Sequence, residues 1–149
     1  MPKIDLEKIP QLNRTGYPAE YAAPMAGRWV RRLAPATGLT EFGVSQVTLK
    51  PGGWSSQRHW HEGEDEFLVM LSGHAVLVDD SGRIPLGPGD CAAFPKADGN
   101  GHHLVNESDA DCVFIAVGRP ASTDAHYPDI DMRFHAAGEK YVRRDGSDF

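Results

Sequence analysis

The feature that most constrains the fold is a series of short extended segments separated by turn-forming residues. From Arg28 to Arg119, runs rich in Val, Thr, Leu and Phe alternate with turns that contain Gly, Pro or Asp. Strands at such short intervals, with no helix of length between them, are typical of an antiparallel sandwich or barrel. The sequence therefore predicts an all-β fold, with strands over 28–34, 40–50, 54–61, 66–72, 74–79, 83–86, 91–95, 102–106 and 112–119.

The two ends of the chain lack this period. Residues 1–27 are interrupted by prolines yet carry many apolar side chains, and the alternation is lost again after Pro120. We expect an irregular N-terminal arm over 1–27, with short helical turns near 4–9 and 19–23, that packs on the barrel or on a partner. A barrel over 28–119 and an irregular C-terminal arm over 120–149 follow. Apolar arms and open sheet edges both need cover, which predicts a homodimer.

Charge and hydropathy exclude several partners. The formal net charge is −6, and no cluster of Lys and Arg is large enough to follow a phosphate backbone, so nucleic acid is not expected. We interpret Arg28, Arg31 and Arg32, and the pair at 143–144, as solvated faces rather than an anion site. No apolar run approaches a membrane span, and the N-terminus lacks the apolar core of a signal peptide. A cytoplasmic protein with no membrane partner is expected.

Several side chains capable of binding metals receive a structural interpretation. Cys91 and Cys112 lie in apolar strand-like segments without close spacing, so we expect buried free thiols rather than a disulfide or metal ligands. His74 follows a glycine at a turn, and His126 and His135 lie in the C-terminal arm. We expect all three histidines at the surface.

Two histidines one residue apart, His59 and His61, form the clearest candidate site. Strand side chains alternate, so both project from one face, together with Ser55 and Gln57. Alone, the pair is better explained as exposed strand histidines, because short motifs have a high false-positive rate. Ser55 and Gln57 are candidates for contacts with the metal ligands or with a substrate.

A carboxylate follows at the start of the next predicted strand. Glu66 opens this strand, and steps of two residues put Leu68 and Met70 on the same side as an apolar floor. Polar groups that converge over apolar walls are expected of a ligand pocket. Met70 is therefore a candidate substrate contact.

The wider spacing resembles the first sequence motif of the cupin superfamily. Five residues separate Gly53 from His59, one separates His59 from His61, four separate His61 from Glu66, and six separate Glu66 from Gly73. These residues and spacings agree with that motif in every position. Of the neighbouring acidic residues, Glu66 alone has the six-residue distance to Gly73. The agreement of several identities and spacings at once favours a metal site over exposed histidines.

A second cupin motif follows in modified form. Its first half is resembled by Gly89 and Pro95, which five residues separate. Its end is resembled by His102 and Asn106, which three residues separate. The segment 96–101 between the two halves is longer than in the family pattern, which puts the approach of the histidine in doubt. The resemblance covers residues 42–118 approximately and is that of a small single-domain cupin.

The resemblance implies a double-stranded β-helix, or jelly-roll barrel, that holds a divalent metal with three histidines and one glutamate. His59, His61 and Glu66 are three of the implied ligands. Spacing to Asn106 favours His102 as the fourth, and His103 should then face outward, although it is kept as a candidate substrate contact. Nitrogen and oxygen ligands of this kind suit Fe, Mn, Ni, Co, Cu or Zn, so the metal stays open.

The implied function is binding of a small molecule at this metal. An open-site cation can bind a keto acid, a diol or a sugar derivative, and an isomerase, a lyase or a dioxygenase would all fit. The alternative is a non-catalytic binding or sensing module, because one barrel hosts both uses. A pure scaffold is disfavoured, since it has no need of such ligands facing one cavity.

Overall fold

Short antiparallel strands dominate the structure, a computed structural model that describes residues 3–149. Met1 and Pro2, which begin the expected N-terminal arm, lie outside the described residues. The helical turns expected near 4–9 and 19–23 are confirmed, because each segment contains one. The helical elements are η1 (Leu6–Lys8), α1 (Ala19–Ala22), η2 (Ala23–Gly27), α2 (Leu33–Ala36) and η3 (Ala136–Gly138).

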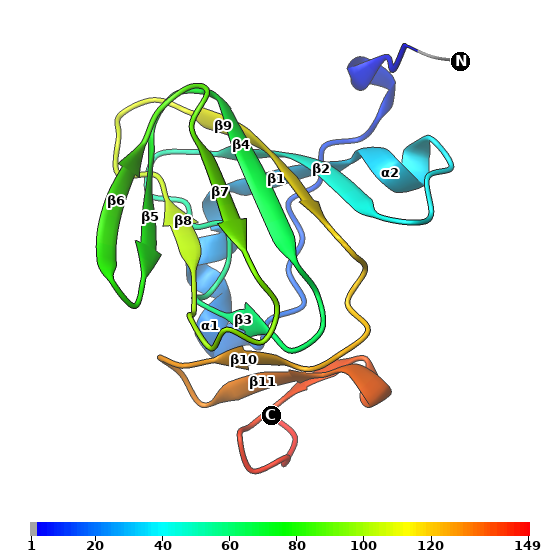
Figure 1. The fold of residues 1–149 in the computed structure, drawn as a ribbon, viewed down its shortest axis with the longest axis vertical. Coiled ribbons are helices and arrows are strands. Elements are labelled where there is room, and N and C mark those ends of the chain that lie inside the picture. The colour runs from blue at the N-terminus through cyan, green and yellow to red at the C-terminus, as the bar shows by residue number, and fades with distance from the viewer. Residues whose placement is uncertain (1–2) are drawn as a thin grey trace.

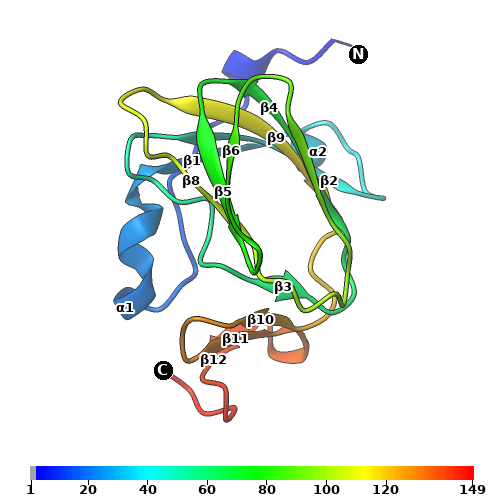
Figure 2. The same cartoon turned by 60° about the vertical axis from the view of Figure 1, so that its left-hand side comes forward.

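Two antiparallel sheets form the walls of the barrel (Figure 1). The larger sheet has the order β1-β2-β9-β4-β7 and the smaller one β6-β5-β8, and Figure 2 shows them facing each other. The expected all-β fold is confirmed. The strands of the larger sheet are β1 (Arg28–Arg32), β2 (Gly43–Leu49), β9 (Cys112–Gly118), β4 (Glu66–Ser72) and β7 (Cys91–Phe94), and those of the smaller are β6 (Gly82–Leu86), β5 (Ala75–Asp79) and β8 (His103–Val105).

The hydrophobic core lies between these sheets because alternate strand residues point inward. On β4, Leu68 and Met70 are buried, whereas Phe67 and Leu71 are exposed. Burial of each such side chain contributes about 1.5–3 kcal/mol. Met70, only 1% exposed, is part of this core and does not line the cavity described below.

The C-terminal arm is more regular than expected. It contains β10 (Ala125–Tyr127), β11 (Met132–His135) and β12 (Lys140–Val142), which extend β3 (Trp60–His61) into a sheet of order β12-β11-β10-β3. An exposed strand edge has unpaired N–H and C=O groups, and pairing of β10 with β3 satisfies those of β3. The C-terminal hairpin formed by β10 and β11 lies beside β3 at the lower end of the barrel (Figure 2).

The two arms pack against each other. Tyr17 of the N-terminal arm meets Tyr127 of β10 and Tyr141 of β12 edge to face, with ring centroids 5.8 and 5.1 Å apart. Buried Met132 of β11 joins the same apolar cluster. The proposed division of the chain at residues 28 and 119 remains a prediction.

One predicted strand is much shorter than expected. The segment 54–61 forms a regular strand only at Trp60 and His61. Before Trp60 its backbone makes isolated hydrogen bonds and no continuous ladder: the Ser55 N–H donates to the Leu104 carbonyl, and the His59 N–H donates to the His102 carbonyl. The segment 28–34 ends at Arg32, after which α2 turns the chain. The strand over 66–72 has the expected bounds, and the remaining predicted strands are confirmed with ends shifted by a few residues.

The cysteine prediction is half right. Both thiols are free and Cys112 is buried, but Cys91 is exposed. The prediction was wrong for Cys91 because the apolar composition of β7 does not reveal which residues of this edge strand face outward. Within residues 3–149, no helix is long and apolar enough to cross a membrane.

Candidate metal centre

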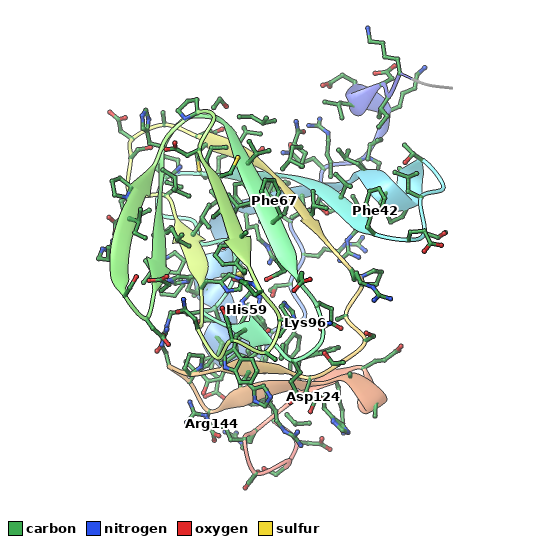
Figure 3. The ribbon with its side chains drawn as sticks, in the orientation of Figure 1. Phe42, His59, Phe67, Lys96, Asp124 and Arg144 are labelled. Carbon is green, nitrogen blue, oxygen red and sulfur yellow. The ribbon has the colours of Figure 1, made fainter. Side chains whose placement is uncertain are left out.

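Three of the predicted ligands converge at one end of the barrel. His59 directly precedes β3, His61 ends it and Glu66 opens β4, so the loop between the two strands returns the carboxylate to the histidines. One ligand atom from each residue lies within 4.8 Å of the others. Figure 3 shows His59 inside the lower part of the barrel, close to the C-terminal hairpin.

His102 reaches the same cluster from the opposite sheet. Its Nε2 lies 2.7 Å from Glu66 Oε2, and its ring centroid is 5.0 Å from that of His59. His59 Nε2 is 3.1 Å from His61 Nε2, and His61 Nε2 is 3.4 Å from Glu66 Oε1. Three imidazole nitrogens and one carboxylate therefore meet in a small volume.

These distances fit a transition-metal site. Nitrogen and oxygen ligands about 2.1 Å from one ion, in neighbouring coordination positions, lie about 3 Å from each other. The His59–His61, His61–Glu66 and Glu66–His102 contacts, at 3.1, 3.4 and 2.7 Å, are close to this spacing, and His59 Nε2 lies 3.7 Å from Glu66 Oε2. His102 joins the compact group of His59, His61 and Glu66 through its contact with Glu66. No other group of three or more potential ligands of this compactness occurs among residues 3–149.

Hydrogen bonds to the far side of the His59 ring orient it. His59 Nδ1 lies 2.9 Å from the Gln57 carbonyl oxygen, which can only accept, so Nδ1 carries the proton. Nε2 then keeps its lone pair and faces the other ligands. A backbone carbonyl that fixes the tautomer in this way is the usual support of a metal-binding histidine.

The charges of the cluster suit a cation. Burial is the largest influence on His59 and lowers its pKa to about 4, so the imidazole is neutral at neutral pH. For Glu66, burial alone would raise the pKa, but hydrogen bonds from His102 and His61 outweigh it and the pKa is lowered. Burial also lowers the pKa of His61, whereas the bond to Glu66 raises it and prevails. His59 as a neutral imidazole and Glu66 as an ionised carboxylate are therefore in the states that bind metals, whereas an ion bound at His61 would have to displace its proton.

Packed rings and the lengthened loop hold the histidines in place. Phe94 stacks on His102 with ring centroids 3.6 Å apart, and Tyr127 stacks on His59 at 5.6 Å. In the loop 96–101, the Ala97 N–H donates to the His61 carbonyl over 2.7 Å. The extra residues of this loop therefore bind the histidine segment and do not displace His102.

Arg58 fastens the outer side of the cluster. Its Nε and Nη2 donate to the two oxygens of Asp129, each over 2.8 Å, and Nη1 donates to Asp80 and to the Gly101 carbonyl. Arg58 precedes His59 and Gly101 precedes His102, so this hydrogen bond connects the two segments that carry the histidines.

The ligand cluster lines a cavity of about 400 Å³. Its apolar wall includes Leu68, Phe94 and Phe114, and its polar wall includes Ser55 and His103. This combination of apolar surface with a few convergent polar groups is that of a small-molecule site.

The structure separates the substrate-contact candidates into two groups. Ser55 and His103 line the cavity, but Gln57 and Met70 do not. Gln57 instead donates through Nε2 to the Tyr21 carbonyl. The expectation that His103 faces outward is wrong, since it is buried against Trp54 with Nδ1 bonded to the Ser56 carbonyl. Alternation does not hold there because the facing segment is not a regular strand.

Sequence reasoning missed the parts of the cavity that come from distant segments. Tyr17, Tyr127 and Tyr141 line it from the two arms, and Arg28 and Arg119 line it from β1 and the end of β9. Only the apolar character of the arms pointed to such packing. No local pattern marks these residues.

The remaining histidines lie away from the cluster. His74 is exposed. His126 stacks on Trp60 and bonds Glu62 over 2.7 Å, and His135 lies 3.6 Å from Asp124. His126 and His135 are partly buried, so the expectation of surface positions is only partly correct for these two.

Comparison with known proteins agrees with this geometry. The family model described as a cupin domain matches residues 45–118. A crystal structure of a sugar phosphate isomerase from a cupin superfamily, from Silicibacter pomeroyi, is 46% identical and superposes with a TM-score of 0.93 over 99% of this chain and 96% of that one. A putative sugar phosphate isomerase from Acidithiobacillus ferrooxidans is 26% identical, with a TM-score of 0.73 over 80% of each chain.

A curated relative carries a different name. The oxalate-binding protein of Thermotoga maritima is 34% identical over 73 residues. These residues are 49% of this chain, and they span 58% of the length of that relative.

Proposed function

Because the chain belongs to the cupin superfamily, we propose that it is a metal-dependent isomerase of a small sugar phosphate. The proposed ligands are His59, His61, Glu66 and His102, and the proposed ion is a divalent first-row transition metal. The observation that carries this proposal is the meeting of three imidazole nitrogens and one carboxylate at the wall of a 400 Å³ cavity.

The substrate class is supported by size, polarity and likeness. A cavity of about 400 Å³ suits a molecule of sugar size, and it offers hydroxyl, imidazole and guanidinium groups beside an apolar wall. The relative with 46% identity over nearly the whole of both chains is described as a sugar phosphate isomerase. Among the enzyme classes that the motif allows, this favours isomerisation over lyase or dioxygenase chemistry.

A bound divalent cation would polarise a carbonyl or hydroxyl group of the substrate and favour loss of the neighbouring proton. The chain's own residues orient the molecule. His103 Nδ1 donates to the Ser56 carbonyl, so its Nε2 is left to accept a hydrogen bond from a substrate hydroxyl. Burial raises the pKa of Tyr17 to about 12, which keeps its phenol protonated and able to donate.

Metal analysis and turnover test this function together. The purified protein should contain about one divalent ion per chain. After reloading with Fe, Mn, Ni, Co, Cu or Zn separately, at least one form should interconvert an aldose phosphate and its ketose. Protein without metal, and without turnover on a panel of sugar phosphates in any loaded form, would overturn the proposal.

A second candidate is a non-catalytic binding module for a small dicarboxylate. The 34% identity to an oxalate-binding protein over 73 residues favours it. Oxalate can bind a metal through two oxygens, which requires no proton transfer by the protein. Tight calorimetric binding of oxalate to metal-loaded protein, without turnover of any sugar phosphate, would select this candidate.

We also propose that the chain forms a homodimer through the outer face of the larger sheet. Phe67 and Leu71 of β4 are 42% and 47% exposed there, and β4 lies between β9 and β7 rather than at an edge. Large apolar side chains exposed in mid-sheet are typical of a surface that a partner covers. The cytoplasmic location remains a prediction.

A further inference from the structure

A second cavity, of about 450 Å³, adjoins the cavity that the proposed metal ligands line, which is called the metal cavity below. The two share the lining residues Arg28, Val30, Gly43, Ser45 and Arg119, so they are neighbours along the inner faces of β1 and β2. The second cavity is further lined by Arg14 of the N-terminal arm and by Arg32 at the end of β1. Four arginines therefore surround one space.

No acidic residue balances these arginines. Asp and Glu are absent from the lining of the second cavity. Within residues 3–149, no ion pair includes Arg14, Arg28, Arg32 or Arg119, although neighbouring Arg31 lies 3.7 Å from Glu7. Arg14, Arg32 and Arg119 are exposed and Arg28 is partly buried, so solvent screens part of the repulsion between these like charges. An anion placed among them would remove the rest.

Arg28 is held rigidly between the two cavities. Its Nη1 donates to the Ser55 carbonyl over 2.9 Å, and its Nη2 donates to the Arg14 carbonyl over 3.0 Å. Its Nε is buried and has no hydrogen-bond partner. Arginine has five N–H donors, so donors remain for a ligand after the backbone has fixed the side chain. Such preorganisation reduces the entropy lost on binding.

The chemistry of the site selects phosphate. A guanidinium group matches the oxygens of a phosphate with two parallel hydrogen bonds, and several of them neutralise a dianion. A single carboxylate would leave most of the four charges unbalanced. A position next to the metal cavity suits a ligand with one anionic end and one hydroxyl-rich end.

We propose that the arginine cavity binds the phosphoryl group of the substrate, while the sugar end lies at the proposed metal ligands. This inference rests on the proposed function for the identity of the substrate. The presence of a phosphate site does not rest on it, because the arginines lie outside the ligand cluster. The interpretation of Arg32 as part of a solvated face, made from the sequence, agrees with its exposure, whereas Arg28 is partly buried. This proposal assigns both of them an anion to bind.

Calorimetric titration with inorganic phosphate tests the site without reference to turnover. The protein as purified, and the same protein after chelator treatment, should both bind phosphate, because the arginines need no metal. The Arg32→Gln and Arg119→Gln variants should each bind at least about tenfold more weakly. Arg83→Gln is the matched control: Arg83 is half exposed on β6 and pairs with Glu107, and its variant should bind like wild type.

Two comparisons separate this inference from the proposed function. Binding of a hexose 6-phosphate should exceed that of the unphosphorylated hexose, and the difference should shrink in the Arg119→Gln variant with an unchanged melting temperature. Phosphate binding that disappears on chelation, or that is equal in wild type and both arginine variants, would overturn the inference. Phosphate binding with the expected variant pattern but no isomerase activity would uphold the inference and overturn the proposed function.

Discussion

His102 Nε2 lies 2.7 Å from Glu66 Oε2, although the two residues belong to opposite walls of the barrel. Glu66 opens β4 of the larger sheet, and His102 directly precedes β8 of the smaller one. An ion bound between them would connect the two sheets. Metal binding and stability of the barrel should therefore be coupled.

Replacement of both strand histidines should abolish metal binding. The double variant His59→Ala/His61→Ala removes two of the four proposed ligands, so metal content measured by mass spectrometry should fall from about one ion per chain to near zero. His74→Ala removes an exposed histidine away from the cluster and is the control. Equal metal content in wild type and the double variant would contradict the proposed site.

Removal of the metal from the wild-type protein should lower its melting temperature. A ligand at about 100 times its dissociation constant stabilises the folded state by about 2.7 kcal/mol, which chelation would take away. The double histidine variant should show no such shift, because it has no metal to lose. A wild-type melting temperature unchanged by chelation, in protein shown to contain metal, would speak against the coupling.

The neighbours His102 and His103 should differ in their effect on the metal. His102→Ala should reduce metal content, because His102 contacts Glu66, whereas His103→Ala should keep it, because the Nδ1 of His103 bonds the Ser56 carbonyl. In the His103→Ala variant, substrate binding should weaken instead. Metal loss in His103→Ala with retention in His102→Ala would reverse the assignment.

The Arg58–Asp129 pair should stabilise the fold measurably. Asp129→Asn removes the charge that holds two guanidinium N–H groups, and the Arg58 side chain is only 14% exposed. The asparagine amide keeps only one acceptor oxygen, so one donor of this largely buried group loses its partner. This loss, together with that of the charge, should lower the free energy of unfolding by about 1–2 kcal/mol, measured by urea denaturation. Glu107→Gln removes a half-exposed pair with Arg83 and should change it by less than about 0.5 kcal/mol.

Asp124 should make stability depend on acidic pH. The Ala136 N–H, and then His135 and Arg133, hold the pKa of this carboxyl below its usual range. A lowered pKa in the folded state means that the stabilisation is complete above the unfolded value, about 3.9, and is lost as pH falls through the folded one. The difference in unfolding free energy between wild type and Asp124→Asn should therefore shrink below about pH 4. A difference that is constant from neutral pH to about pH 2.5 would contradict this.

A charge on the outer face of β4 should dissociate the proposed dimer. Phe67→Glu places a carboxylate at the centre of the exposed apolar surface and should give a monomer by light scattering. Phe42→Glu is the control, because Phe42 is equally exposed (44%) but lies near α2, away from this face (Figure 3). A wild-type protein that is monomeric at micromolar concentration would overturn the dimer itself.

Much of the fold could be predicted because its signals are local. The strand over 66–72 has the expected bounds, since alternation of buried and exposed residues along β4 follows from the pleat. The segment 54–61 could not be predicted correctly, because its backbone pairs singly with residues around 102–105 and does not form a continuous ladder. The inference that Gln57 shares a face with His59 failed for the same reason.

By itself, the sequence determined the architecture and the residues proposed as metal ligands. Spacing between His59, His61, Glu66 and their flanking glycines is a property of one continuous stretch of chain. Only the tertiary structure decided what surrounds them. Tyr17 and Tyr141 reach the cavity because the two arms pack together, and Arg28 and Arg119 line the same cavity because β1 and β9 both pair with β2. Contacts between segments so far apart depend on how the sheets close around the core, and no local pattern records that closure.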